Sequence, residues 1–175
     1  ELAIVYKRFL SLDKYRNDPT LLERASELLK NNAQAGTTAL KVQLLRARYL
    51  AAEQLLENYR LRYASKEEAI ESIAQLKEII KGLSTIHSKL MAKAKRSSTR
   101  TEVYDLIGMT TSLLAWSNYY LAWFETDRIA AESAQNYFAL MIQAESPTFQ
   151  QVSFDVKSKE YGARAILGIA LCKAI

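Results

Sequence analysis

Few residues in this chain are of the types that perform acid–base, nucleophilic or metal chemistry. The 175 residues include one histidine, His87, and one cysteine, Cys172. A Ser-His-Asp triad would have to use His87, and no G-x-S-x-G turn is present to hold a serine. Helical di-iron sites need a glutamate three residues before a histidine, but Ser84 occupies that position. We therefore expect a protein that is not an enzyme and that needs no metal or cofactor.

The same two residues have structural interpretations. Cys172 lies in the apolar segment AILGIALCKAI, so we expect a packed, unreactive thiol. A single cysteine also excludes an intrachain disulfide. We expect His87, in STIHSK, on a helix surface or in a hydrogen bond between helices. Glycine-rich phosphate loops are absent from the sequence.

Positive charge gathers in one segment. The formal net charge is +5, and residues 81–100 contain six basic residues and no acidic residue, so the rest of the chain sums to −1. Lys89, Lys93 and Arg96 recur at spacings of four and three, which places them on one stripe of a helix. Together with Arg100 they form a candidate site for phosphate groups or an acidic partner.

An alternative interpretation of this basic segment is purely structural. Cations near a helix C-terminus interact favourably with the helix dipole, and an antiparallel helix would bring Glu102 and Asp105 close to them. No aromatic residues alternate with the lysines, as a single-strand binding surface would require. Nucleic acid is therefore possible as a partner but less favoured than protein.

Four arginines of residues 38–63 alternate with tyrosines. We expect these arginines to lie on a solvated helix face. The arginines are Arg46, Arg48, Arg60 and Arg62, and the tyrosines are Tyr49, Tyr59 and Tyr63.

The stretch SLLAWSNYYLAWFETD, residues 112–127, concentrates five of the seventeen aromatic residues: Trp116, Tyr119, Tyr120, Trp123 and Phe124. On a helix they fall within an arc of roughly 140°, and neighbouring leucines widen the apolar side to about 160°. Thr111, Asn118 and Glu125 are expected on the opposite side. A helical core is the favoured interpretation. The phenol ends of Tyr119 and Tyr120 remain candidates for partner contact, and a small-molecule site between helices near 116–124 is a further alternative.

The elements that position these residues are expected to be helices throughout. Five glycines and two prolines leave little material for the turns of a β-fold. Four helix starts have capping signals: Asp18 before Pro19, Ser65 with Glu68, Thr99 with Glu102, and Asp127. The expected helices cover 1–10, 19–32, 38–63, 66–95, 100–126, 128–145 and 155–175, the sixth being closed by Ser146 and Pro147.

Length and hydropathy bound the organisation of the chain. Residues 1–175 are expected to form one all-helical domain. No apolar run approaches the 18 residues of a membrane span, so no span is expected. The chain starts without Met or a signal peptide and stops inside a predicted helix. We expect a piece of a longer protein, whose compartment the sequence does not assign.

Residues 112–175 resemble the tetratricopeptide repeat, in which small residues let paired helices approach closely and an aromatic residue packs between hairpins. The positions that carry the resemblance are Ala122, Ala134, Phe138 and Pro147, followed by Leu167, Gly168 and Leu171. The resemblance implies an all-α fold of antiparallel helical hairpins stacked as a short α-solenoid. A closed helical bundle is the alternative fold.

The sequence therefore favours a non-catalytic helical-repeat scaffold, or a module that binds a protein or peptide between successive hairpins. The first alternative is an anionic-surface or nucleic-acid binder acting through 81–100. The second alternative is the small-molecule site near 116–124.

Overall fold

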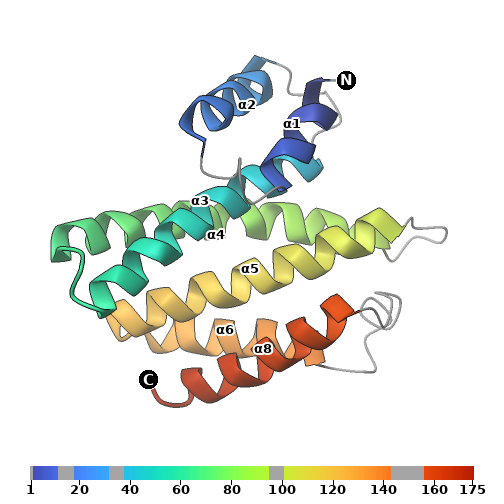
Figure 1. Ribbon diagram of the computed structural model, residues 1–175. Coiled ribbons are helices and arrows are strands. Elements are labelled where there is room, and N and C mark those ends of the chain that lie inside the picture. The colour runs from blue at the N-terminus through green and yellow to red at the C-terminus, as the bar shows by residue number, and fades with distance from the viewer. Residues whose placement is uncertain (1, 12–17, 32–37, 95–100, 143–155) are drawn as a thin grey trace.

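The computed structural model describes residues 2–11, 18–31, 38–94, 101–142 and 156–175, and the regular structure in these ranges is entirely α-helical (Figure 1). The helices are α1 (Leu2–Ser11), α2 (Pro19–Asn31), α3 (Thr38–Arg60), α4 (Lys66–Ala94), α5 (Thr101–Glu125), α6 (Arg128–Ile142) and α8 (Val156–Cys172). The all-α prediction is confirmed. No helix of the described residues is both long and apolar enough to cross a membrane.

Side chains at the predicted caps fix where the helices begin. Asp18 Oδ1 accepts a hydrogen bond from the Leu21 amide at 3.1 Å, directly before Pro19 opens α2. Ser65 and Glu68 form a reciprocal capping box ahead of α4. The Glu68 amide donates to Ser65 Oγ at 3.2 Å and the Ser65 amide donates to Glu68 Oε2 at 2.7 Å. The predicted cap at Thr99 lies outside the described residues.

The α3–α4 connection begins earlier than the sequence predicts. We expected the helix to reach about Tyr63, but α3 ends at Arg60 because Arg62 has a φ of 64°. The Tyr63 amide then donates to the Asn58 carbonyl at 2.7 Å, and the Arg62 amide to the Tyr59 carbonyl at 2.9 Å. These two bonds form a Schellman motif, which satisfies the last carbonyls of α3 and reverses the chain.

The α5–α6 connection is shorter still. Thr126 and Asp127 alone both end α5 and begin α6. Thr126 has a φ of 56°, and the Asp127 amide donates to the Ala122 carbonyl at 3.2 Å, as in a second Schellman motif. The Asp127 carboxylate caps α6 by accepting from the amides of Ile129 and Ala130 at 2.9 and 3.2 Å. The predicted cap is confirmed, and α5 and α6 fold back as a hairpin.

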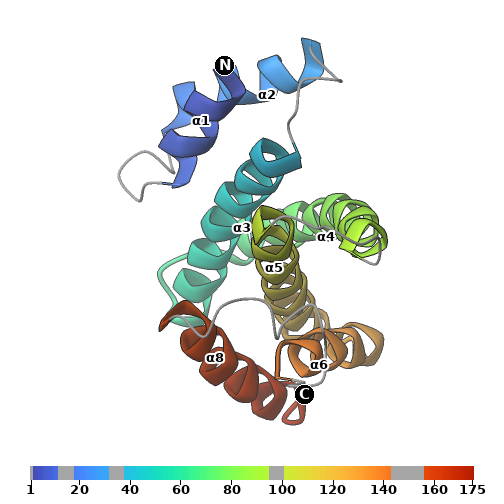
Figure 2. The same ribbon diagram turned by 90° about the vertical axis from the view of Figure 1, so that its right-hand side faces the viewer.

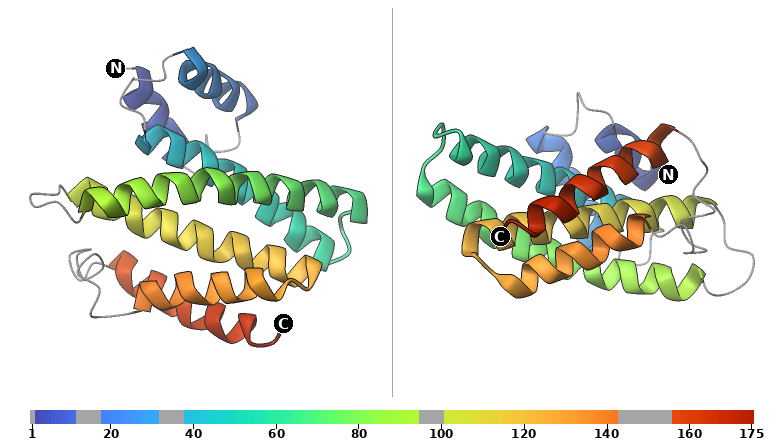
Figure 3. Two further views of the ribbon diagram at one scale, coloured as in Figure 1. Left: turned by 180° about the vertical axis from the view of Figure 1, so that it is seen from behind. Right: turned by 90° about the horizontal axis from the view of Figure 1, so that it is seen from below.

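Helix α5 occupies the centre of the molecule. It packs against α3, α4, α6 and α8, and Figure 2 shows α4 and α6 on one side of it and α3 and α8 on the other. The main hydrophobic core extends along all five helices. Helices α6 and α8 lie side by side below α5 (Figure 3).

Because α5 is surrounded, the side opposite its aromatic arc is also buried for much of its length. Thr111 is fully buried and Asn118 is buried as well, although Glu125 at the helix end is exposed. Their polar atoms are satisfied within the helix itself. Thr111 Oγ1 donates to the Ile107 carbonyl at 2.8 Å, and Asn118 Nδ2 to the Leu114 carbonyl at 2.7 Å. Such back-bonding lets short polar side chains pack among apolar neighbours.

Helices α1 and α2 pack mainly against each other and against α3, above the rest of the molecule (Figures 1 and 3). They share a separate small core formed by Leu10, Ala25, Leu40 and Leu44.

Helix α8 also departs from its expected end. It stops at Cys172 rather than at the last residue. A tighter turn follows, in which the Ala174 amide donates to the Leu171 carbonyl at 3.1 Å. Cys172 is buried, as expected, and burial raises the pKa of its thiol to about 11. The thiol is therefore protonated and unreactive at neutral pH.

Candidate functional site

A network of tyrosines and glutamates joins α3 to the centre of α5, and we call these residues the Tyr–Glu cluster: Tyr49, Glu53, Glu57 and Tyr120. The first three recur every four residues, so they share one face of α3. The Tyr49 hydroxyl donates to Glu53 Oε1 at 2.7 Å. The Tyr120 hydroxyl donates to Glu57 Oε1 at 2.9 Å and lies 3.4 Å from Glu53 Oε1.

The electrostatics of the cluster favour hydrogen bonding over proton transfer. Burial raises the pKa of Tyr49 well above its usual value, and the charge and hydrogen bond of Glu53 raise it further. Burial also raises the pKa of Tyr120, with the charge of Glu53 and the hydrogen bond to Glu57 adding to the effect. Both phenols therefore remain neutral donors near pH 7. The arrangement fixes the two carboxylates in place.

Two arginines border this cluster. Arg60 Nη2 lies 2.6 Å from Glu57 Oε2, with more than half of the Arg60 side chain exposed. Arg164 projects from α8, and its Cζ lies 5.4 Å from the centroid of the Trp116 ring, within the range of a cation–π interaction. Arg164 is exposed and makes no ion pair with a carboxylate of the described residues. The α8 edge of the site therefore presents an unpaired cation on an aromatic support.

Aromatic rings pack closely beneath Arg164. The Trp116 ring meets Tyr119 edge-on at 5.6 Å between centroids and Phe138 of α6 at 5.0 Å. Trp116 is only 7% exposed, and its Nε1 has no hydrogen-bond acceptor among the residues that the structure describes. The core interpretation of the aromatic stretch agrees with this packing. The groove found between α3 and α4 involves none of residues 116–124.

The residues predicted to contact a partner do not lie together in one site. Tyr120 belongs to the cluster, whereas the hydroxyl of Tyr119 beside it makes no hydrogen bond with another described residue. Burial raises the pKa of Tyr119, while the positive charge of Arg60 opposes the shift. Lys89 and Lys93 are exposed in the last turns of α4.

The remaining two basic residues, Arg96 and Arg100, lie outside the described residues, so the predicted basic stripe is seen only in part. Helices α4 and α5 pack side by side and run in opposite directions (Figure 1). Lys89 and Lys93 near the end of α4 are therefore far from Tyr119 and Tyr120 near the end of α5.

His87 is buried between helices, in the hydrogen-bonding position that the sequence suggested. Its Nδ1 lies 3.1 Å from Thr110 Oγ1 of α5. The Thr110 hydroxyl also lies within hydrogen-bond distance of the Leu106 and Ile107 carbonyls, at 2.8 and 3.0 Å, so the pair joins α4 to the backbone of α5. Burial lowers the pKa of His87. No group of three or more potential ligands among the described residues could hold a metal ion.

Glu53, Glu57 and Arg164 were missed at the sequence level, and Tyr49 was noted only as one of the tyrosines that alternate with arginines. The glutamates could have been found, because Tyr49, Glu53 and Glu57 share a helix face at a spacing of four. Arg164 gave no comparable signal, since only the packing of α8 on α5 brings it over Trp116.

Comparison with known proteins identifies no relative. No protein-family model, no curated protein and no solved structure matches this chain.

Proposed function

We propose that this chain is a non-catalytic helical-repeat module that binds a partner protein or peptide on the face formed by α3, α5 and α8. The observation that carries the proposal is the exposed Arg164 guanidinium over Trp116, beside the Tyr–Glu cluster. Tryptophan, tyrosine and arginine are the residue types that dominate binding energy at protein interfaces. Here Arg164 is the exposed residue, and the buried Trp116, Tyr49 and Tyr120 hold it and the two carboxylates in place on three helices. A partner would therefore bind at little cost in ordering these groups.

The helix arrangement supports the repeat part of this proposal. Each of α3–α4 and α5–α6 is a hairpin with a short turn, and α8 packs on α6 as the first helix of a further hairpin would. Helices α3, α5 and α8 then correspond to the first helices of successive repeats.

Some positions of the tetratricopeptide resemblance are compatible with the same scheme, whereas Leu167 is exposed and Pro147 lies outside the described residues. Ala122, Ala134 and Phe138 are fully buried at the α5–α6 contact, and Phe138 packs against Gly168 of α8. The 25-residue length of α5 exceeds the short helices of that family, so the proposed repeat is a divergent form.

An affinity experiment tests the proposed face. Proteins captured from an extract of the source cells by the wild-type chain would be compared with those captured by Arg164→Ala. Arg128→Ala, which removes an exposed arginine from α6, is the matched control. Each protein lost only with Arg164→Ala would then be purified and its affinity measured directly by calorimetry.

We expect the affinity of a true partner to fall about tenfold or more in Arg164→Ala, as is usual for a central interface arginine. It should remain within about twofold in Arg128→Ala. Far-UV circular dichroism would confirm that both variants are folded. If no captured protein is lost with Arg164→Ala, or if the purified partners bind that variant as tightly as the wild type, this face is not the binding surface.

A further inference from the structure

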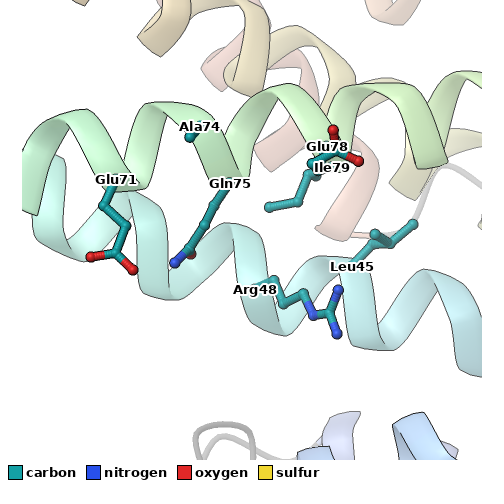
Figure 4. Close-up of a pocket in the computed structure, with 7 residues that line it drawn as sticks. All are labelled: Leu45, Arg48, Glu71, Ala74, Gln75, Glu78 and Ile79. Atoms are coloured by element: carbon teal, nitrogen blue, oxygen red, sulfur yellow. The ribbon is translucent and has the colours of Figure 1, made fainter.

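A groove of about 620 Å³ runs between α3 and α4. It lies on the α3–α4 hairpin, whereas the Tyr–Glu cluster faces α5 and α8, so the two are separate surfaces. Figure 4 shows Leu45 and Arg48 on α3 at one side, and Glu71, Gln75 and Glu78 along α4 at the other. Ala74 and the buried Ile79 complete the lining.

The charged side chains around this groove have no ion-pair partners within the described part of the chain. Arg48, Glu71 and Glu78 are exposed, and none of them makes an ion pair or side-chain hydrogen bond with another described residue. Gln75 is likewise without a hydrogen bond there. The groove thus combines an apolar base, formed by Leu45 and Ile79, with a cation on one rim and two carboxylates on the other.

The backbone spacing of Glu71 and Glu78 favours a helical ligand. Glu71 and Glu78 are seven residues apart on one helix, which is two turns or about 10.5 Å. A partner helix presents its own residues i and i+7 on one face at the same distance. A β-strand presents one face at about 6.7 or 13.4 Å, and so matches the backbone spacing of the two glutamates less closely. A polyproline II segment offers about 9.3 Å and fits less closely.

We propose that this groove binds one amphipathic helix of a partner protein. The bound helix presents apolar side chains to Leu45 and Ile79, and two basic residues at i and i+7 to Glu71 and Glu78. An acidic residue on its other flank pairs with Arg48. This is recognition of a helix in a groove, in which charge pairs set the register and orientation while apolar contact supplies affinity.

Designed peptides test the charge pattern. The first peptide is a stable helix of about 18 residues, with Lys at i and i+7, Leu and Ala on the groove side, and Glu on the flank facing Arg48. The second peptide has the same composition with the Lys and Glu positions exchanged. Binding of each fluorescently labelled peptide to the whole chain would be followed by anisotropy.

We expect the first peptide to bind about tenfold tighter than the second, since several charge pairs change sign together. The preference should invert in the double variant Glu71→Lys/Glu78→Lys. The matched control is Glu23→Lys/Glu132→Lys, which changes the net charge equally at exposed positions of α2 and α6.

Three results would overturn the proposal: equal binding of both peptides, no measurable binding of either at millimolar concentration, or equal weakening in the control variant. Tighter binding by a proline-rich peptide carrying Lys at i and i+3 would assign the groove to an extended segment instead. Because Arg164 does not line this groove, Arg164→Ala should leave peptide binding unchanged. The failure of one proposal is therefore distinguishable from failure of the other.

Discussion

Thr126 shows how a single residue controls a whole hairpin. Thr126 lies between the end of α5 and Asp127, the cap of α6. Its backbone is left-handed, with a φ of 56°. A β-branched residue in that region is strained by about 1–2 kcal/mol, because its Cβ approaches the neighbouring carbonyl oxygen. Its side chain is exposed, so the position gains nothing from packing that would offset the strain.

We expect Thr126→Gly to raise the free energy of unfolding by about 0.5–1 kcal/mol, the relief of strain exceeding the entropy that glycine gains in the unfolded chain. Urea denaturation measures the change. Thr85→Gly is the matched control, because Thr85 is exposed inside α4, and it should lower stability by a few tenths of a kcal/mol. A loss of stability in Thr126→Gly would show that the turn tolerates threonine without strain.

Local chemistry explains which single residues could be anticipated from the sequence. The caps at Asp18, Ser65 and Asp127 depend on side chains bonding to amides two or three residues away, so spacing alone predicts them. The positive φ of Arg62 was missed, because a Schellman turn usually carries glycine there. The contact of Arg164 with Trp116 joins positions 48 residues apart in sequence, and no local pattern encodes it.

The packing of helix α8 on helix α6 depends on a glycine, Gly168, which has no side chain. A Cβ added at Gly168 would lie 2.3 Å from Cζ of Phe138, which is fully buried. The Phe138 ring is also held by Trp116, with 5.0 Å between ring centroids, so it has little freedom to move away. The glycine thus sets how closely the two helices approach.

We predict that Gly168→Ala lowers the free energy of unfolding by about 1–3 kcal/mol, the usual cost of overpacking a core. Gly162→Ala on the same helix should raise it by up to about 1 kcal/mol, because nothing lies within 4 Å of the added Cβ and alanine favours the helix. Urea denaturation followed by far-UV circular dichroism gives both values. If steric contact is the cause, Phe138→Leu should make Gly168→Ala less costly in a double-mutant cycle. If the two substitutions have independent, additive effects on the free energy of unfolding, steric contact with Phe138 is not the cause.

Helix α5 shows how far periodicity can predict an element. Its apolar arc located the core, because Trp116, Tyr119 and Tyr120 are all buried. The same arc placed Thr111 and Asn118 on the opposite side of the helix, and both are buried there as well. Periodicity assigns burial by residue type. It does not count how many helices surround an element, and short polar residues that bond to their own helix can occupy a core.

For the molecule as a whole, the division of the core predicts uneven stability. Most apolar side chains belong to one cluster around α5, whereas α1 and α2 rest on α3 through the small core of Leu10, Ala25, Leu40 and Leu44. Segments with few buried contacts open at a lower free energy than the global unfolding transition. Helices α1 and α2 should therefore open while α3 to α8 remain folded.

Native-state hydrogen exchange tests this division directly. Leu10, only 1% exposed, lies within the small core, and Leu10→Ala should weaken it by about 2–3 kcal/mol. Amide exchange in α1 and α2 should then accelerate by about 30- to 150-fold, while exchange in α5 stays within about twofold of the wild type. Phe138→Ala acts on the main cluster and should instead accelerate exchange in α5. Equal acceleration of all helices in Leu10→Ala would mean that the chain unfolds as one cooperative unit, since a defect in the small core would then weaken every helix alike.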